Sequence, residues 1–252
     1  MGNTLQILIT AGGTSERIDN VRRITNSGTG ALGAKIAEAF AAAERDCRIT
    51  YICSASAIRP PGNVSVICAD DIDSVAEAVK RACAETRFDI IIHSMAIGDY
   101  KVRAVSDTSL ATAGVIERLS VLACGDSQSP EEAIQDVLLS PAGITDAKIS
   151  SDKEDLLIVL EKAPKIIALY RGLAPEATII GFKLLSDASE EELVSAGLAL
   201  LKKNDCDFVL ANDMKTVRSD MHEGLLIKKD GTYERATGKD NIAKLVVKAS
   251  LN

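Results

Sequence analysis

The sequence predicts an α/β fold, a doubly wound, largely parallel Rossmann-like sheet with helices on both faces. Short apolar runs such as "LQILITA", "ITYICSAS" and "FDIIIHS" alternate along the chain with amphipathic helical patterns, which is the order expected of βαβ units. The third run is apolar at successive positions, as in a strand that helices cover on both sides. The first run ends in Gly-Gly, and open α/β sheets bind their ligands where such strands end.

Each element of the first half follows from its own pattern. The strand "LQILITAGG" has a tight glycine exit, and a helix over about 34–45 places Ile36 and Phe40 on one face. The runs "ITYICSAS" and "VSVICAD" predict two strands, and "DIDSVAEAVKRACAETR" predicts a helix with Asp71 or Asp73 near its N-cap. The apolar run in "FDIIIHSMAIGDY" predicts the next strand of the sheet.

Residues 101–147 interrupt this rhythm with Ser, Thr, Asp, Gly and Pro. We interpret them as a flap or dimerisation arm inserted into a single domain over residues 1–252. The pattern then returns, because "DLLIVLEKAPKIIALYRGLAPEATIIGFKLL" predicts a strand, a helix and a strand of the sheet. A helix over 189–203, the strand "FVLAND", the hairpin "GLLIKKDGTYER" turning at Asp230-Gly231, and the helix "NIAKLVVKASL" complete the chain.

Composition excludes several classes of protein. No stretch approaches the roughly 18 apolar residues of a membrane span, and the start "MGNTLQILIT" lacks the features of a secretory signal. A net charge of −7 argues against the basic surfaces that bind nucleic acid. The six cysteines form no C-x-x-C pair and there are two histidines, which argues against structural zinc and favours reduced thiols. We expect a cytoplasmic protein with neither a membrane nor a nucleic-acid partner.

A glycine pattern near residue 30 raises the question of a dinucleotide site. Gly28, Gly30 and Gly33 spell G-x-G-x-x-G, but the first strand ends near Ala11, too early for a nicotinamide fingerprint, and the next strand closes on Ser54 rather than an acid. Glycines that lead into a helix expose backbone N–H groups to an anion. Ordinary turn and N-cap chemistry is the alternative interpretation.

A second glycine-rich loop follows the first strand at Gly12 and Gly13. Two such loops beside one strand end predict a pocket there. Arg22 and Arg23 lie between the loops in the sequence and are candidates for binding a phosphate group, although exposed arginines also serve solubility alone.

Five segments carry a resemblance to a known family. "TAGGTSERIDNVRRITNSGTGALGAKIAEAF", "SMAIGDYKV", "DAKISS", "IIGFKLL" and "VLANDM" occur in this order along almost the whole chain, which thereby resembles phosphopantothenate–cysteine ligase, also called phosphopantothenoylcysteine synthetase, in its stand-alone bacterial form. The resemblance implies a coenzyme A biosynthesis step. In it, 4′-phosphopantothenate is activated by CTP, or less favourably ATP, with Mg²⁺ and joined to cysteine through an acyl-nucleotide. It also implies a homodimer.

The resemblance also implies roles for residues of this chain. Asn26 would handle the acyl-nucleotide, and Lys148 would stabilise charge as the carboxylate attacks the α-phosphate. The predicted substrate-binding residues are Asn26, Arg22, Ala96 and Asp99. With the glycines of the two loops, the predicted nucleotide-binding residues are Gly12, Gly13, Gly30, Gly33, His93, Ser94, Met95, Asp99, Pro164, Lys165, Ile166, Ile167, Phe182, Lys202 and Lys203. The metal ligands stay unassigned.

The sequence departs from the family at some positions. Ser150 and Ser151 stand where the family often has lysines, and Ala163 replaces a frequent asparagine. A non-catalytic nucleotide-binding relative is therefore an alternative. An NAD(P)-dependent short-chain oxidoreductase is disfavoured, because none of the four tyrosines is followed by lysine four residues later. His93 is expected to pack as a strand residue, and Lys202 and Lys203 also suit the end of a helix for structural reasons.

Overall fold

The computed structural model describes residues 4–43, 45–124, 128–144, 148–217 and 221–251. The chain divides into two compact units. The first comprises Met1–Thr14, Asn26–Ile97 and Lys165–Asn252, and the second comprises Ser15–Thr25 and Gly98–Pro164. The arm predicted over 101–147 lies within the second unit, with 125–127 and 145–147 outside the described residues. The interpretation as a single domain stays a prediction.

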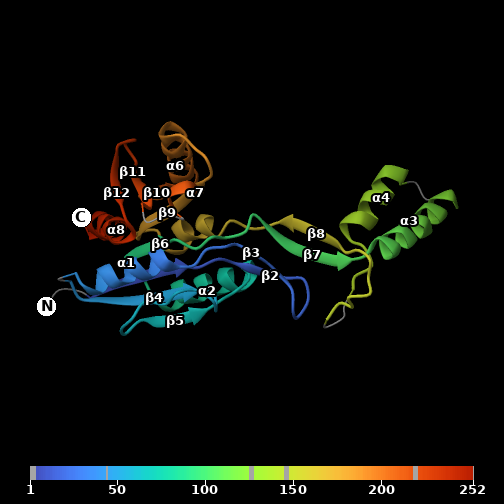
Figure 1. Ribbon diagram of the computed structural model, residues 1–252, viewed down its shortest axis with the longest axis horizontal. Helices are drawn as coiled ribbons and strands as arrows, with labels where there is room; N and C mark the ends of the chain where they lie inside the picture. The colour runs from blue at the N-terminus through green and yellow to red at the C-terminus, as the bar shows by residue number, and fades with distance from the viewer. Residues whose placement is uncertain (1–3, 44, 125–127, 145–147, 218–220, 252) are drawn as a thin grey trace. The chain divides into compact units, whose positions relative to one another are not determined.

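An eight-stranded sheet forms the centre of the first unit, in the order β12-β11-β10-β9-β6-β1-β4-β5 (Figure 1). Its strands are β1 Leu5–Ala11, β4 Cys47–Cys53, β5 Ser65–Cys68, β6 Ile90–His93, β9 Thr178–Leu185, β10 Phe208–Asp213, β11 Glu223–Lys228 and β12 Tyr233–Thr237. The pairs from β5 through β10 are parallel, whereas β11 and β12 are antiparallel. This confirms the predicted fold class and the hairpin, whose Gly231 adopts a φ of 87°.

Helices cover both faces of this sheet. They are α1 Ala31–Ala41, α2 Ile72–Glu85, the 3-10 helix η1 Ile166–Leu169, α5 Tyr170–Leu173, α6 Glu190–Asn204, α7 Met214–Val217 and α8 Lys239–Leu251. Asp71, rather than Asp73, is the N-cap of α2, and its side chain accepts from the Ser74 backbone N–H at 2.7 Å. Among the described residues, none of the helices is sufficiently long and apolar to cross a bilayer.

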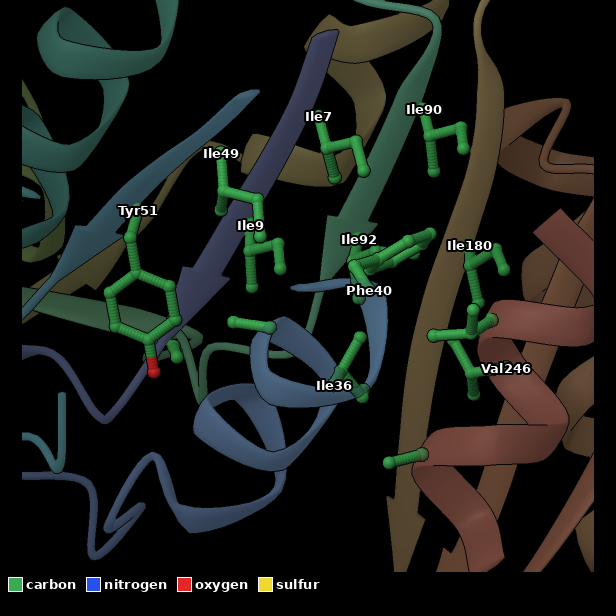
Figure 2. Packing of buried hydrophobic residues seen from close by; sticks show 14 of the residues in the cluster. Ile7, Ile9, Ile36, Phe40, Ile49, Tyr51, Ile90, Ile92, Ile180 and Val246 are labelled. Atoms are coloured by element: carbon green, nitrogen blue, oxygen red, sulfur yellow. The ribbon is translucent and has the colours of Figure 1, made fainter. Parts of the chain in front are cut away.

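The main core lies between the sheet and the pair α1 and α8, which pack against each other (Figure 2). Strand residues alternate between the two faces, so every second residue of a strand enters this core. Its labelled members in Figure 2 are Ile7, Ile9, Ile49, Tyr51, Ile90, Ile92, Ile180, Ile36, Phe40 and Val246. Helix α6 packs on the opposite face, where Leu193 meets Ala211, Leu225 and Ile227.

The second unit consists of ribbons and a helical pair. Strands β2 Ser15–Arg17 and β3 Arg23–Thr25 form an antiparallel ribbon, as do β7 Tyr100–Ser106 and β8 Leu157–Lys162. Helices α3 Thr108–Ala123 and α4 Pro130–Leu139 pack together. The expectation that the run in "DLLIVLE" rejoins the main sheet is wrong, because β8 pairs with β7. An apolar run of this length indicates a strand but not its partner.

Candidate active site

The two glycine-rich loops meet where β1 ends. A methyl group at Gly13 would lie 2.1 Å from the carbonyl oxygen of Asn26, and one at Gly28 would lie 2.6 Å from that of Gly12. Gly12 and Gly30 adopt φ values of 93° and 75°, a conformation that side chains other than glycine rarely tolerate. The loops therefore pack backbone against backbone, and the glycines are required by that approach.

Hydrogen bonds join these loops to the segment after β6. The Ala96 N–H donates to Gly12 O at 2.8 Å, and the Thr14 N–H donates to Ala96 O at 3.0 Å. The side-chain amide of Asn26 donates from Nδ2 to the same Ala96 oxygen at 3.2 Å. The structure thus brings together Gly12, Gly13, Asn26 and Ala96 at one end of the parallel strands, as predicted from the two loops.

Helix α1 begins at this cluster, and the Thr29 Oγ1 accepts from its first backbone N–H, that of Ala31, at 3.4 Å. Gly30 provides no side-chain cap, and the first turn of α1 contains no acidic residue. The first backbone N–H groups of a helix have no partners within the helix and carry partial positive charge, so they favour an anion. Gly33 serves packing, because a methyl group there would lie 2.6 Å from the Ala11 Cβ and 2.8 Å from the Ser94 Oγ.

Ser54 adds a polar group that the sequence did not mark as a ligand-binding residue. It is 2% exposed, and its Oγ has no hydrogen-bond partner in the described part of the chain. A methyl group at Gly12 would lie 2.6 Å from this Oγ. Buried hydroxyl groups normally have a partner, so the Ser54 Oγ is an unpaired polar atom beside the Gly12 loop. Its place directly after β4 was the available signal.

His93 lies at the end of β6 with its ring in the interior. The ring Nδ1 lies 2.8 Å from Thr10 Oγ1 and 3.0 Å from the Tyr170 hydroxyl oxygen. Burial lowers the pKa of His93 to about 4, so the ring is neutral near pH 7. This agrees with its expected packing role. Tyr170, which sequence analysis did not single out, fixes the ring with Thr10.

The other predicted nucleotide residues of the first unit differ in their surroundings. The Ser94 Oγ donates to Thr10 O at 2.8 Å, and Met95, Ile166 and Ile167 are buried. Phe182 is partly buried against the main core, whereas Lys165 is exposed. Side chains held in these ways leave mainly backbone groups of the segment after β6 for a ligand.

Lys202 and Lys203 lie away from the loops. They are exposed residues in the last turn of α6. This helix follows the end of β9 and leads to the start of β10, which is parallel to β9. A helix in such a crossover runs antiparallel to the strands. The last turn of α6 therefore lies at the amino ends of the parallel strands, whereas Gly12 lies at their carboxyl ends. Within one chain, the structure does not bring this lysine pair to the glycine loops.

In the second unit, Asp19 joins Arg22 to the segment that carries Lys148. The Asp19 carboxylate accepts from the backbone N–H groups of Val21 at 2.7 Å, Arg22 at 2.6 Å and Ile149 at 3.2 Å. Arg22 Nη1 donates to the same carboxylate at 2.8 Å and to Ile149 O at 3.2 Å. The Arg22 backbone N–H, with the others, lowers the pKa of Asp19 to about 2.

These contacts hold Arg22 against the segment that contains Lys148, although the two predicted residues are far apart in the sequence. Lys148 is exposed and directly precedes Ile149, which is buried. Asp99 and Pro164 belong to the same unit, where both are exposed, and the Asp99 carbonyl accepts from the Ala163 N–H at 3.0 Å. Sequence analysis missed Asp19. The only local signal for Asp19 was its position two residues before Val21 and three before Arg22, whose backbone N–H groups an Asx-turn would bond.

Comparisons with known proteins identify the family of this chain. The family model described as "DNA/pantothenate metabolism flavoprotein C-terminal domain" matches residues 3–120 and 133–252. The coenzyme A biosynthesis bifunctional protein CoaBC of Thermococcus kodakarensis is 28% identical, over 89% of this chain and 45% of its own length. That of Methanocaldococcus jannaschii is 26% identical, over 98% of this chain and 52% of its own. The chain thus spans about half the length of these curated relatives.

Solved structures extend the comparison. The DNA/pantothenate metabolism flavoprotein from Streptococcus pneumoniae is 31% identical, covers 98% of both chains and has a TM-score of 0.77. A complex of Cab2 with phosphopantothenate-cysteine shares the fold, with a TM-score of 0.66, 14% identity and coverage of 98% of this chain and 85% of that one. This chain therefore belongs to the family of DNA/pantothenate metabolism flavoprotein C-terminal domains.

Proposed function

We propose that this chain is a phosphopantothenate–cysteine ligase that uses a nucleoside triphosphate. The observation that supports this most strongly is the N-terminus of α1, with glycine as its N-cap and no acid in its first turn, beside two interlocked glycine loops and the Asn26 amide. This arrangement offers N–H donors to phosphate oxygens and an amide to an acyl group. Family membership supports the same reaction.

The reaction proceeds in two steps that share this site. A carboxylate oxygen of 4′-phosphopantothenate attacks the α-phosphorus, the bond to pyrophosphate breaks, and a mixed anhydride forms. The cysteine amine then attacks the acyl carbon, loses a proton and displaces the nucleoside monophosphate. A carboxylate by itself has a poor leaving group. The first step replaces it with a nucleoside monophosphate, a good leaving group, so that the cysteine amine can form the amide bond.

Named residues take separate parts in these steps. The loops at Gly12, Gly13 and Gly30 bind phosphate oxygens through backbone N–H groups. Asn26 holds the acyl-nucleotide, because one of its amide hydrogens is used on Ala96 O and the other is left for the acyl oxygen. Arg22, whose side chain is 40% exposed, binds the substrate phosphate with the guanidinium hydrogens that Asp19 and Ile149 do not use.

CTP is the expected nucleotide, with ATP as the alternative, and Mg²⁺ accompanies it. No group of three His, Cys, Asp or Glu side chains suited to a metal occurs among the residues that the structure describes. Mg²⁺ commonly binds through substrate phosphates and one or two carboxylates, so a nucleotide-borne ion fits this chain better than a resident one. When bound, Mg²⁺ neutralises charge on the phosphates.

A product assay tests the proposed function. The purified full chain would receive 4′-phosphopantothenate, cysteine and Mg²⁺ with either CTP or ATP, and mass spectrometry would follow the products. We expect 4′-phosphopantothenoylcysteine, pyrophosphate and the nucleoside monophosphate, faster with CTP. Absence of product with both nucleotides would favour a non-catalytic relative. That alternative is motivated by Ser150, which stands where the family often has a lysine and whose Oγ donates to Asp152 at 3.0 Å.

Replacing Lys148 by Gln should slow formation of the acyl-nucleotide about tenfold. The effect is modest because Lys148 is exposed, so water and salt screen its charge. Pyrophosphate release in the absence of cysteine measures this step. Lys162→Gln, at an exposed lysine of β8, is the matched control and should keep the wild-type rate. An unchanged rate in the Lys148 variant would remove Lys148 from the mechanism.

The expected homodimer has support in the second unit. Helix α3 carries two charged residues, Glu117 and Arg118, in its 16 positions. Apolar side chains on α3 and α4 are exposed, namely Leu110, Ile116, Val121, Leu138 and Leu139. Exposed apolar groups on two packed helices are typical of an interface.

An Ile116→Glu variant should shift the protein from dimer to monomer. Ile116 is 60% exposed, so the substitution adds a charge to the interface without emptying a core. Light scattering during size-exclusion chromatography measures the molar mass. Met221→Glu, at a residue 67% exposed in the first unit, is the control and should stay dimeric. A monomeric wild-type protein would contradict the homodimer.

A further inference from the structure

Two cysteines lie side by side at the end of strands β4 and β5. Cys53 and Cys68 are register partners in this parallel pair, and register partners project from the same face of a sheet. Neighbouring strands are about 4.8 Å apart, within the range of roughly 4.4–6.8 Å between the Cα atoms of disulfide-bonded cysteines. The backbone therefore already satisfies the main requirement for a bond between their sulfur atoms.

The two thiols share a cation and differ in exposure. Cys68 is exposed on the edge strand, and Arg59 Nη2 lies 3.2 Å from its Sγ. Cys53 is fully buried. Burial raises the pKa of the Cys53 thiol, while the charge and hydrogen bond of Arg59 act in the opposite direction. A guanidinium beside a sulfur favours the thiolate, which is the reactive form.

We propose that Cys53 and Cys68 form a redox-sensitive dithiol, with Cys68 as the residue that a peroxide oxidises first and Cys53 as its resolving partner. The Cys68 thiolate attacks a peroxide oxygen, so the O–O bond breaks, water leaves after protonation and a sulfenic acid remains. The Cys53 sulfur then attacks the Cys68 sulfur. The S–O bond breaks, a second water leaves with the Cys53 proton, and a disulfide forms.

This dithiol is coupled to the proposed nucleotide site through the loop that follows β4. Ser54 succeeds Cys53 and packs against Gly12. In the same loop, the Ile58 N–H donates to Thr29 O at 2.9 Å, next to the N-cap of α1. Arg59 follows at once in the chain. Oxidation consumes the Cys68 thiol that Arg59 contacts, so Arg59 loses this contact, the loop before it is no longer held there, and turnover falls. This consequence, unlike the disulfide itself, rests on the proposed function.

Peptide mass spectrometry after peroxide treatment tests the dithiol directly. Trypsin does not cut between Arg59 and Pro60, so residues 49–80 form one peptide that contains Cys53, Cys68 and no other cysteine. In the full chain treated with hydrogen peroxide, unfolded in guanidinium chloride and then treated with N-ethylmaleimide, we expect this peptide to lose two hydrogen atoms and to take up no label. Dithiothreitol should restore both labelling sites. Cys68→Ser and Cys53→Ser should each prevent the loss of two hydrogens.

The same samples provide the controls. Cys124, exposed in the second unit, reports whether peroxide reached ordinary thiols. A peptide 49–80 that keeps both labels while Cys124 is oxidised would overturn the proposal, as would addition of oxygen to Cys68 without a disulfide. Arg59→Gln should slow alkylation of Cys68, because it removes the guanidinium that lies 3.2 Å from the Cys68 Sγ, whereas Arg81→Gln should not.

Ligase turnover is a separate readout. Oxidation should cause a loss of activity that dithiothreitol reverses, and the Cys68→Ser protein should keep its activity under peroxide. If reduced protein shows no turnover at all, the proposed function fails, while the mass of peptide 49–80 still decides whether the dithiol exists. Disulfide formation with unchanged turnover would overturn the coupling to the nucleotide site.

Discussion

Replacing Asn26 by Asp should lower the rate of product formation about 10²- to 10³-fold and cause the acyl-nucleotide to accumulate. The Asn26 amide donates to Ala96 O at 3.2 Å, and a carboxylate cannot donate there. It would instead set a negative charge against a carbonyl oxygen and a developing oxyanion. Loss of one donor to a developing oxyanion commonly costs this much in rate.

Quenched-flow samples analysed by mass spectrometry measure both quantities. The expected pattern is early release of pyrophosphate, a persistent acyl-nucleotide and little amide product. Asn241→Asp provides the matched control, because the Asn241 amide also donates to a backbone carbonyl, Thr237 O at 2.8 Å, but from helix α8. A normal rate without accumulated intermediate in the Asn26 variant would contradict its assigned role.

The sheet could be predicted because its information is local. The strands β1, β4, β6 and β10 are apolar runs of the right length between helical patterns, and β11 and β12 are joined by an Asp-Gly turn. The first glycine loop could be placed at the ligand-binding end of the sheet because it follows β1, and the second leads into α1, which packs on β1. Their close approach, with Gly13 against Asn26 and Gly28 against Gly12, explains why glycine recurs there.

Other features depend on contacts between residues far apart in the sequence. The partner of β8 could not be identified from its apolar run, because β7 would suit it no better than the main sheet by pattern alone. His93 and Tyr170 are 77 positions apart and meet in the interior. The position of Lys202 and Lys203, in contrast, was predictable. A helix that connects two parallel strands runs antiparallel to them, so the last turn of α6 lies at the amino ends of the strands, opposite Gly12.

Asp19 is the missed residue with the largest expected effect, since it bonds both Arg22 and Ile149, the latter 130 positions away in the sequence. We expect Asp19→Asn to lower turnover about 10²-fold, the cost that a misplacement near 1 Å can carry. Asparagine places an NH₂ group where one carboxylate oxygen accepts from Arg22 Nη1 and from the Ile149 N–H. The segment carrying Lys148 then loses its connection to Arg22.

The acid dependence of stability gives Asp19 a second readout. Its pKa is about 2 in the folded chain, against an ordinary value of 3.8. A carboxyl group with a lowered pKa stabilises the fold fully above its ordinary value, and this contribution disappears as the pH falls toward the folded value. As the pH falls from about 4 to 2, the melting temperature of the wild-type protein should therefore fall more steeply than that of the Asp19→Asn variant.

Thermal unfolding across this pH range, combined with turnover at neutral pH, distinguishes positioning from general damage. Asp155→Asn is the control in the same unit, because Asp155 accepts from the Thr108 hydroxyl at 2.6 Å at an exposed site. It should keep wild-type turnover. An Asp19→Asn protein that turns over normally would show that Arg22 and Lys148 act without this carboxylate. Unchanged acid dependence would mean that Asp19 is protonated to the same extent before and after unfolding.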